Sequence, residues 1–229
     1  MGLLYTPKDA LALFTNRSTS FLPVQGTTAS GASLDPETGT QYELGAKAAL
    51  LDQKVTATVS LFELTRGDVA VSDRDNPSAL IPIGEQRARG LEASLRGKLT
   101  ESWNLYLAYG YTDAETTEDT NGALIGKPIR NVPKNTWSLA MNYVIGEAFN
   151  VGTAINYVDE RTGDIEGSFS LPDYWRADMF ASYALNKQWQ LRLAVENITD
   201  EKYYEHAFSL FEVWQGAPRT VSASIKATF

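Results

Sequence analysis

The sequence predicts an all-β fold: a transmembrane antiparallel β-barrel portion of roughly ten meandering strands. The first observation is strict alternation of apolar and polar residues, clearest from Thr220 to Phe229, which indicates strands with one apolar and one polar face. The second is that short turns and long loops alternate between these segments. The third is that no apolar run approaches the length of a membrane helix, whereas segments of about ten residues suit tilted membrane strands.

Composition excludes several classes of function. The chain of 229 residues carries 28 acidic and 20 basic residues, and its net charge of −8 argues against nucleic-acid binding. It has no Cys and one His, which leaves no thiolate or multi-His metal site. Ser, His and Asp are too scattered for a catalytic triad, and no phosphate loop or dinucleotide fingerprint is present. We therefore expect neither catalytic residues nor a resident metal or cofactor.

The segments follow one another in a meander. A strand end and a turn at residues 2–9 precede strands at 10–16, 42–50, 55–61, 91–95, 103–111, 137–143, 149–157, 175–185, 189–195 and 217–229. The long connections are expected at 17–40, 67–85, 113–133, 159–172 and 197–216. The alternation fails at Phe62 and Glu63, where we expect the strand to leave the membrane or to bulge.

The polar face of these strands carries charges of both signs. They are Glu43, Lys47, Lys54, Glu92, Arg96, Arg176, Asp178, Arg192, Glu196 and Lys226. Such charges are tolerated on an inward face only in water or when paired. This favours a wide, wet or plugged lumen over a small barrel filled by side chains.

Several segments, in order along nearly the whole chain, resemble the C-terminal half of TonB-dependent outer-membrane receptors of the siderophore type. Leu34–Lys47 is similar to the family's L-x-P-E-x-x-x-x-Y-E-x-G-x-K segment, and Val195–Tyr204 to its N-L-x-D-x-x-Y segment. Further matches are the hairpin at residues 2–16, Gly90–Ala93, Pro133–Thr136, Gly216–Arg219 and the terminal Phe229.

The resemblance implies that residues 1–229 form one domain, the C-terminal part of a barrel of about 22 strands. The family's signal peptide, TonB box and plug domain have no counterpart here, so the chain reads as a fragment. We expect an open, incompletely closed sheet in which strand 217–229 lacks its partner, because an open barrel leaves two free edges.

The resemblance also implies uptake of a ferric siderophore across the bacterial cell outer membrane, with no bond made or broken in the ligand. The partners would be outer-membrane lipid, the siderophore, the barrel-assembly machinery and TonB. TonB would act through the missing plug and TonB box. The barrel-assembly machinery would recognise Phe229, at the periplasmic rim, as its key residue. The alternatives are a passive structural or pore-forming barrel and a non-functional remnant of a truncated receptor gene.

The best candidates for ligand contact lie in the last long loop. Aromatic side chains are a common means of holding a bulky, partly apolar chelate, and this loop holds Phe208, Phe211 and Trp214, with Tyr203 and Tyr204 beside them. For Tyr203, Tyr204 and Trp214 the favoured interpretation is nevertheless as girdle residues or loop packing. The same loop carries His206, which could titrate or meet ligand, but an incidental polar residue is the favoured interpretation.

An acidic cluster marks another of the long loops. Asp113, Glu115, Glu118 and Asp119 could bind Ca²⁺, but they lack the spacing of an EF-hand loop. A solvated acidic loop is the favoured interpretation.

Overall fold

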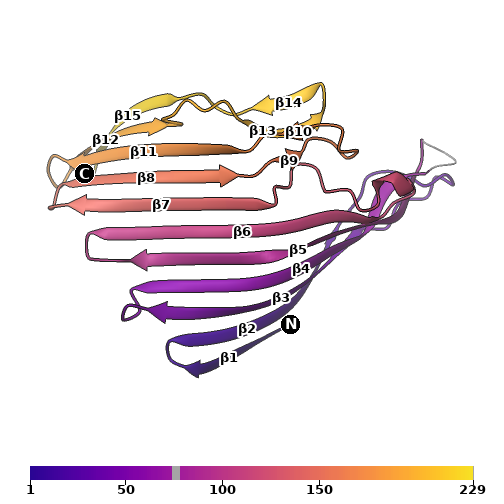
Figure 1. Ribbon diagram of the computed structural model, residues 1–229, viewed down its shortest axis with the longest axis horizontal. Coiled ribbons are helices and arrows are strands. Elements are labelled where there is room, and N and C mark those ends of the chain that lie inside the picture. The colour runs from indigo at the N-terminus through magenta and orange to yellow at the C-terminus, as the bar shows by residue number, and fades with distance from the viewer. Residues whose placement is uncertain (74–77, 229) are drawn as a thin grey trace.

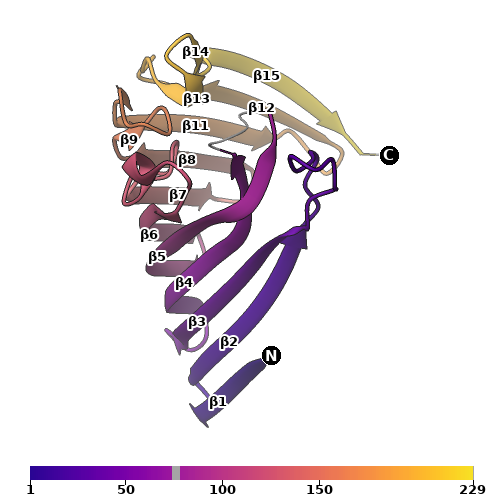
Figure 2. The same ribbon diagram turned by 90° about the vertical axis from the view of Figure 1, so that its right-hand side faces the viewer.

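The computed structural model describes residues 1–73 and 78–228 and shows one curved sheet (Figure 1). Eleven strands pair in the order β1-β2-β3-β4-β5-β6-β7-β8-β11-β12-β15, each antiparallel to its neighbours. Seen from the side, the sheet bends around a concave face (Figure 2). β1 and β15 lie at its two edges and do not pair with each other, so the prediction of an open antiparallel meander is confirmed. Among the described residues, no helix is long and apolar enough to cross a membrane.

The strands differ in length and fall into two groups. The main sheet consists of β1 (Gly2–Lys8), β2 (Leu11–Leu22), β3 (Glu37–Leu50), β4 (Val55–Ser72), β5 (Leu80–Lys98), β6 (Trp103–Glu118), β7 (Asn135–Ile145), β8 (Phe149–Val158), β11 (Tyr174–Ala184), β12 (Trp189–Glu196) and β15 (Thr220–Ala227). The long connections contain a short 3₁₀ turn, η1 (Gly122–Leu124), and two hairpins, β9 (Arg161–Thr162) with β10 (Ser170–Leu171) and β13 (Tyr204–Ser209) with β14 (Glu212–Gln215). We call the side with short turns the turn end and the other side the loop end.

Strands of the N-terminal half run further toward the loop end than the sequence predicts. β2, β4 and β6 continue to Leu22, Ser72 and Glu118, so the predicted loops 17–40, 67–85 and 113–133 are too long. The apolar alternation stops where a strand leaves the lipid, because both faces then meet water. Backbone pairing does not depend on that alternation and continues beyond it.

The acidic segment shows the same effect. Asp113 and Glu115 belong to β6 rather than to a loop, and they pair with Arg89 and Arg87 of β5. Within the described residues, no group of three or more His, Asp or Glu side chains is placed to hold a metal ion. The solvated-loop interpretation is therefore wrong for these two carboxylates, which instead form cross-strand ion pairs.

Predictions for the other connections were incomplete. Loops 159–172 and 197–216 contain the β9–β10 and β13–β14 hairpins. β4 does not end at Phe62 and Glu63 but continues through them, and its register with β5 shifts between Arg66 and Val69 and again between Val69 and Ala70. Glu63 lies opposite Arg89, so the outer face becomes charged at this level, in agreement with a strand that is leaving the membrane.

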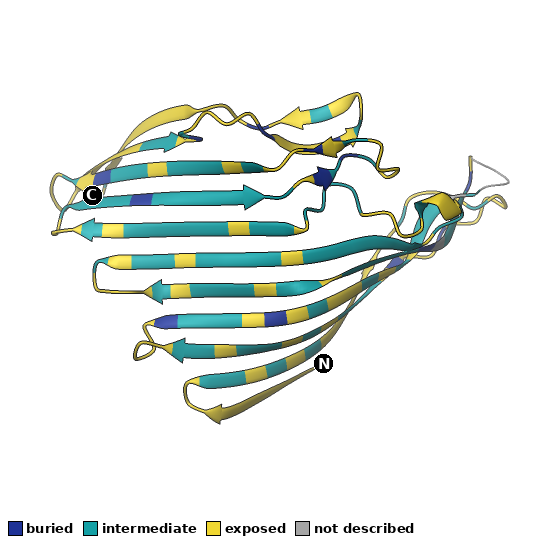
Figure 3. Ribbon diagram, viewed as in Figure 1, coloured by how far each residue is buried: buried dark blue, intermediate teal, exposed yellow. Residues whose placement is uncertain are grey.

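The convex face carries the predicted apolar residues, with aromatic side chains at two heights along the strands. Toward the loop end, Tyr109, Trp137, Tyr157 and Trp175 are successive cross-strand neighbours on β6, β7, β8 and β11. The rings of Tyr109 and Trp137 lie 4.3 Å apart, and those of Tyr157 and Trp175 4.7 Å apart. Tyr143 lies six residues from Trp137, about 20 Å along the strand, which suits the apolar band of an outer-membrane barrel. Much of the central strands is half-buried, whereas the edge strands β1 and β15 are almost entirely exposed (Figure 3).

On the concave face, phenylalanine rings lie across glycines of neighbouring strands. Phe14 lies over Gly45, Phe62 over Gly90 and Phe180 over Gly152. A Cβ atom built on Gly152 would come within 2.3 Å of the Phe180 ring. At Gly45 and Gly152 the missing side chain therefore leaves room for the aromatic ring, whereas at Gly90 a Cβ atom would meet the Tyr111 backbone oxygen first, at 1.9 Å.

Candidate functional site

The predicted ligand residues lie on the β13–β14 hairpin, at the loop end of the sheet. His206 and Trp214 are cross-strand partners, and their rings stack with centroids 4.2 Å apart at 18°. Phe208 carries the guanidinium of Arg130, which lies 4.5 Å from the ring centroid and donates a hydrogen bond of 3.1 Å to the Phe208 carbonyl oxygen. The structure thus gives His206, Phe208 and Trp214 aromatic or cationic partners.

The remaining aromatic residues of this loop divide into exposed and buried. Phe211 is 96% exposed and Phe208 58% exposed, so both are open to a molecule approaching the loop end. Tyr203 is only 3% exposed; it stacks on Tyr174 at 4.6 Å and covers Gly216. Tyr203 is therefore loop packing, the alternative that the sequence left open.

Three connections at the loop end are joined into one unit. Asn131, in the β6–β7 connection, donates a hydrogen bond of 2.8 Å to the Ala207 carbonyl and accepts one of 2.9 Å from the Ala207 N–H. The backbone N–H of Asn131 also donates to the Thr162 carbonyl at 2.8 Å. The β6–β7, β8–β11 and β12–β15 connections therefore hold one another in place.

Arg161 lies at the centre of this unit. It is 5% exposed, and its Nη2 donates to the carbonyl oxygens of Tyr204 at 2.6 Å and Glu205 at 3.0 Å. Its guanidinium lies 5.7 Å from the Tyr174 ring, and burial lowers the pKa of Arg161 from its usual value. Arg161 thus ties the β8–β11 connection to the base of the β13–β14 hairpin.

Asn197 fixes the start of the last loop. It is 1% exposed, and its side-chain amide donates to the carbonyls of Glu201 at 2.9 Å and Ala217 at 3.0 Å, while its side-chain oxygen accepts from the Glu201 N–H. Its backbone N–H donates to the Asp178 carboxylate at 2.7 Å. The segment beginning at Asn197 therefore closes the loop base against the start of β15.

Two loop carboxylates are held in their ionised form. The Asn135 amide donates to Asp159 at 2.7 Å, and this hydrogen bond lowers the pKa of the Asp159 carboxyl. Ser168 donates hydrogen bonds from its hydroxyl and its backbone N–H to Asp164 and lowers the pKa of that carboxyl. Both groups strengthen the loop end most when they are deprotonated.

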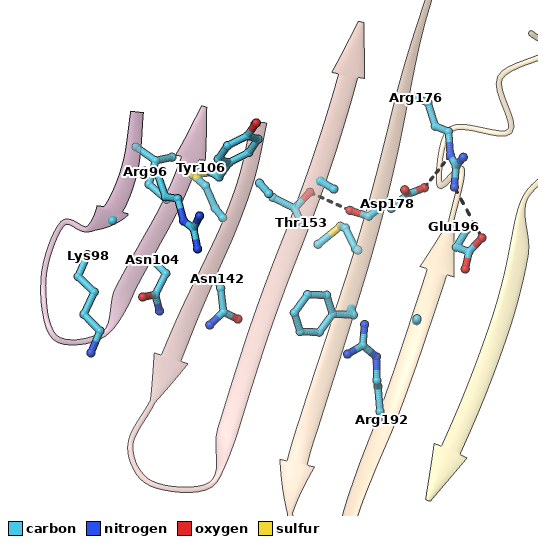
Figure 4. Close-up of a pocket in the computed structure, with 18 of the residues that line it drawn as sticks. Arg96, Lys98, Asn104, Tyr106, Asn142, Thr153, Arg176, Asp178, Arg192 and Glu196 are labelled. Carbon is cyan, nitrogen blue, oxygen red and sulfur yellow. Dashed lines mark hydrogen bonds and ion pairs between the residues drawn. The ribbon is translucent and has the colours of Figure 1, made fainter. Parts of the chain in front are cut away.

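A trough lined by both apolar and charged side chains crosses the concave face, from the turn end of β5 to the loop-end parts of β11 and β12 (Figure 4). It has a volume of about 700 Å³ and extends from β5 to β12. The small side chains of Ala140 and Ala154 leave its middle open, while Asn104, Tyr106 and Asn142 supply neutral polar groups. We refer to this concavity as the inner-wall trough.

The charges around the inner-wall trough are mostly positive. Its lining includes five cationic side chains, Lys54, Arg96, Lys98, Arg176 and Arg192, and two carboxylates, Asp178 and Glu196. Arg176 lies 3.1 Å from Asp178 and 3.6 Å from Glu196, so both carboxylates already have a cationic partner. Lys54 pairs with Glu101 in the neighbouring turn. The predicted charged lumen wall is thus present, with its cations in excess.

The sequence did not identify every residue of the loop unit. Arg130, Asn131 and Arg161 carry it, yet none stands in a recognisable motif, because their partners come from connections tens of residues away. Asn197 lies in a segment that the resemblance had marked, without its role being evident. Phe229 falls outside the described residues, so its predicted role in assembly stays a prediction.

The fold and these sites define a class of protein: part of the wall of a membrane β-barrel, with structured loops at one end and a charged inner face. Residues 1–198 match the family described as "TonB dependent receptor-like, beta-barrel", and the chain belongs to this family of outer-membrane proteins.

Similar proteins of known identity support the same assignment. The chain is 38% identical to the metal-pseudopaline receptor CntO of Pseudomonas aeruginosa and 30% identical to the ferrichrome outer membrane transporter/phage receptor of Escherichia coli. In both cases all of the chain is covered, but only 33% and 31% of the relative. The chain therefore spans about a third of the length of the curated relatives it matches.

Solved structures agree with the fold. The siderophore receptor PiuA of Acinetobacter baumannii superposes with a TM-score of 0.89 at 26% identity, covering 99% of this chain and 35% of PiuA. BauA, the ferric preacinetobactin receptor of the same species, gives a TM-score of 0.86 at 26% identity over 98% of this chain and 35% of BauA. The sheet is thus a barrel portion of the same architecture.

Proposed function

We propose that this chain forms part of the wall of a TonB-dependent outer-membrane transporter that takes up a metal chelate, in the first place a ferric siderophore. The observation that carries the proposal is the loop unit. Three connections lock together through Asn131 and Arg161 and present Phe208, Phe211, Trp214 and His206 above a charged inner face. Exposed aromatic groups on a rigid support suit capture of a bulky, partly apolar ligand.

The remaining steps would involve parts beyond residues 1–229. TonB would act through a plug and TonB box, and the cargo would pass unchanged, so the protein would be no enzyme and need no resident cofactor. The metal would enter only as part of the cargo. Phe229 would direct the chain to the barrel-assembly machinery.

The experiment uses a complete receptor. A hybrid receptor would carry residues 1–229 in place of the equivalent segment of the metal-pseudopaline receptor, which matches the chain over its whole length. Uptake of radioactive iron and zinc, each supplied with a panel of chelators, would be measured in cells with and without TonB. We expect uptake of at least one chelate that requires both the hybrid and TonB.

Two further results would contradict this function. Uptake that persists without TonB would indicate a passive pore instead. A hybrid that never reaches the outer membrane, although the parent receptor does, would indicate that the chain cannot serve as a receptor wall.

The double variant Phe208→Ala/Phe211→Ala tests the candidate contacts. We expect this variant to take up less metal when the chelate is limiting. Leu210→Ala, at an exposed position on the same hairpin, is the matched control.

A further inference from the structure

The inner-wall trough has a charge opposite to that of the chain. The whole protein has a net charge of −8, yet Arg96 and Arg192 line the trough without an ion pair to a carboxylate among the described residues. Lys98 also lines the trough and lies near the Glu101 carboxylate of the adjoining turn, without forming a salt bridge to it. Arg96 and Lys98 lie on β5 and Arg192 lies on β12. Five strand spacings, about 24 Å of curved sheet, separate these two banks.

The position of Arg192 is fixed by its neighbours. Its guanidinium lies 4.2 Å from the Phe180 ring centroid, and Phe180 in turn lies flat over Gly152. Stacking on an aromatic face leaves the N–H groups at the rim of the guanidinium free to donate. Figure 4 shows the Arg192 and Arg96 head groups on opposite sides of the same concavity.

The lining of the trough also holds an unused polar group. The side-chain oxygen of Asn142 is buried without a hydrogen-bond partner among the described residues. An amide can turn by 180° and present its NH₂ group instead. Buried polar groups without partners are costly in an empty wall and gain from a polar occupant.

We propose that the inner-wall trough binds carboxylate groups of the small-molecule cargo on its way past the wall. Two cationic banks, an open middle and the Asn142 amide match a ligand with several carboxylates, and a volume of about 700 Å³ is of the size that holds a small molecule. Arginine pairs bidentately with a carboxylate, which adds geometric selectivity to charge. This inference rests on the proposed transport function and assigns the chemical class of its cargo.

The test uses citrate as a tricarboxylate probe and the hybrid receptor purified in detergent. Calorimetric titration would compare the hybrid, the trough variant Arg96→Gln/Lys98→Gln/Arg192→Gln, and the control variant Lys8→Gln/Lys187→Gln/Lys202→Gln. The control removes the same charge from exposed positions outside the trough. We expect citrate affinity to fall at least tenfold in the trough variant only, with glucose as a neutral probe giving no binding in any of the three proteins.

Each other result decides against a part of the proposal. Equal citrate affinity in the trough and control variants would overturn it. A trough variant that keeps its citrate affinity but melts well below the control would indicate that carboxylates of the rest of the receptor occupy the trough, which also overturns it. If citrate binding depends on the trough but the hybrid shows no TonB-dependent uptake, the proposed function is contradicted and a carboxylate site remains. If the hybrid shows TonB-dependent uptake but the trough variant binds citrate as the hybrid does, this inference alone is contradicted.

Discussion

At the scale of single residues, Asn197 holds the last loop to the sheet through three side-chain hydrogen bonds. Asn197→Ala would leave the carbonyls of Glu201 and Ala217 without this partner and force alanine to a φ of +50°. We expect a loss of about 2–4 kcal/mol, summing about 1 kcal/mol for each bond and about 1 kcal/mol for the backbone. Thermal unfolding of the hybrid receptor, followed by circular dichroism, would measure it.

Asn197→Gly separates the two contributions. Glycine adopts the positive φ without strain but lacks the amide, so its melting temperature should lie between those of Asn197→Ala and the unmodified hybrid. If Asn197→Gly and Asn197→Ala melt together, the backbone conformation contributes nothing, and if both melt like the parent, the three bonds do not hold the loop.

Asp159 makes the loop end sensitive to acid. The Asn135 amide lowers the pKa of this carboxyl, so its stabilising contribution is present above the unfolded-state value near 3.9 and is lost as the pH falls through the lower folded pKa. Asp159→Asn should therefore melt below the hybrid at pH 7, and this difference should shrink below about pH 4. Asp35→Asn, at an exposed position, serves as the control. A difference that stays constant down to pH 3 would show that the ionised carboxylate is not the cause.

The sequence pointed to some residues of the last long loop as candidates and gave no sign of others, for a physical reason. Phe208, Phe211 and Trp214 were singled out because aromatic residues in a long polar loop are unusual, and their contact with ligand stays a prediction. Arg161 and Asn131 could not be found, since their roles consist of hydrogen bonds to backbone carbonyls of other connections. A side chain that binds a distant backbone leaves no pattern in its own neighbourhood.

At the scale of elements, the concave face depends on the fit between Phe180 and Gly152. Gly152→Ala would place a methyl group where the ring lies and displace the support of Arg192, which we expect to cost about 1–3 kcal/mol. In a Phe180→Ala background the same change should cost little, because the clashing ring is gone. Urea midpoints of the four proteins of this cycle, refolded in detergent, would measure the coupling, and equal costs in both backgrounds would refute it.

Also at this scale, the alternation of apolar and polar residues predicted the membrane part of each strand well and the strand ends poorly. Leu44, Leu61 and Leu91, cross-strand neighbours on β3, β4 and β5, alternate visibly because one face meets lipid. Beyond Glu63 and Asp113 polar and charged residues enter the outer face, so the regular alternation disappears although pairing continues. The hairpins inside the loops were missed for the same reason.

At the scale of the whole molecule, the sheet is a wall with two unfinished edges. Among the described residues, β1 pairs only with β2 and β15 only with β12, so each has one side of backbone groups without a strand partner there. A lipid bilayer offers these groups no hydrogen-bond partner, and each unsatisfied group there costs several kcal/mol. The fold is therefore consistent with a chain whose stability depends on further strands.

Hydrogen exchange can test this dependence directly. With residues 1–229 alone in detergent, we expect fast amide exchange in β1 and β15 and slow exchange in β4 to β8, which have paired strands on both sides. In the hybrid receptor, β1 and β15 should become as protected as the central strands, because further strands would complete both ladders. Slow exchange at both edges of the isolated chain would instead mean that it closes on itself or pairs with a second copy, and a crosslinking experiment would distinguish these two cases.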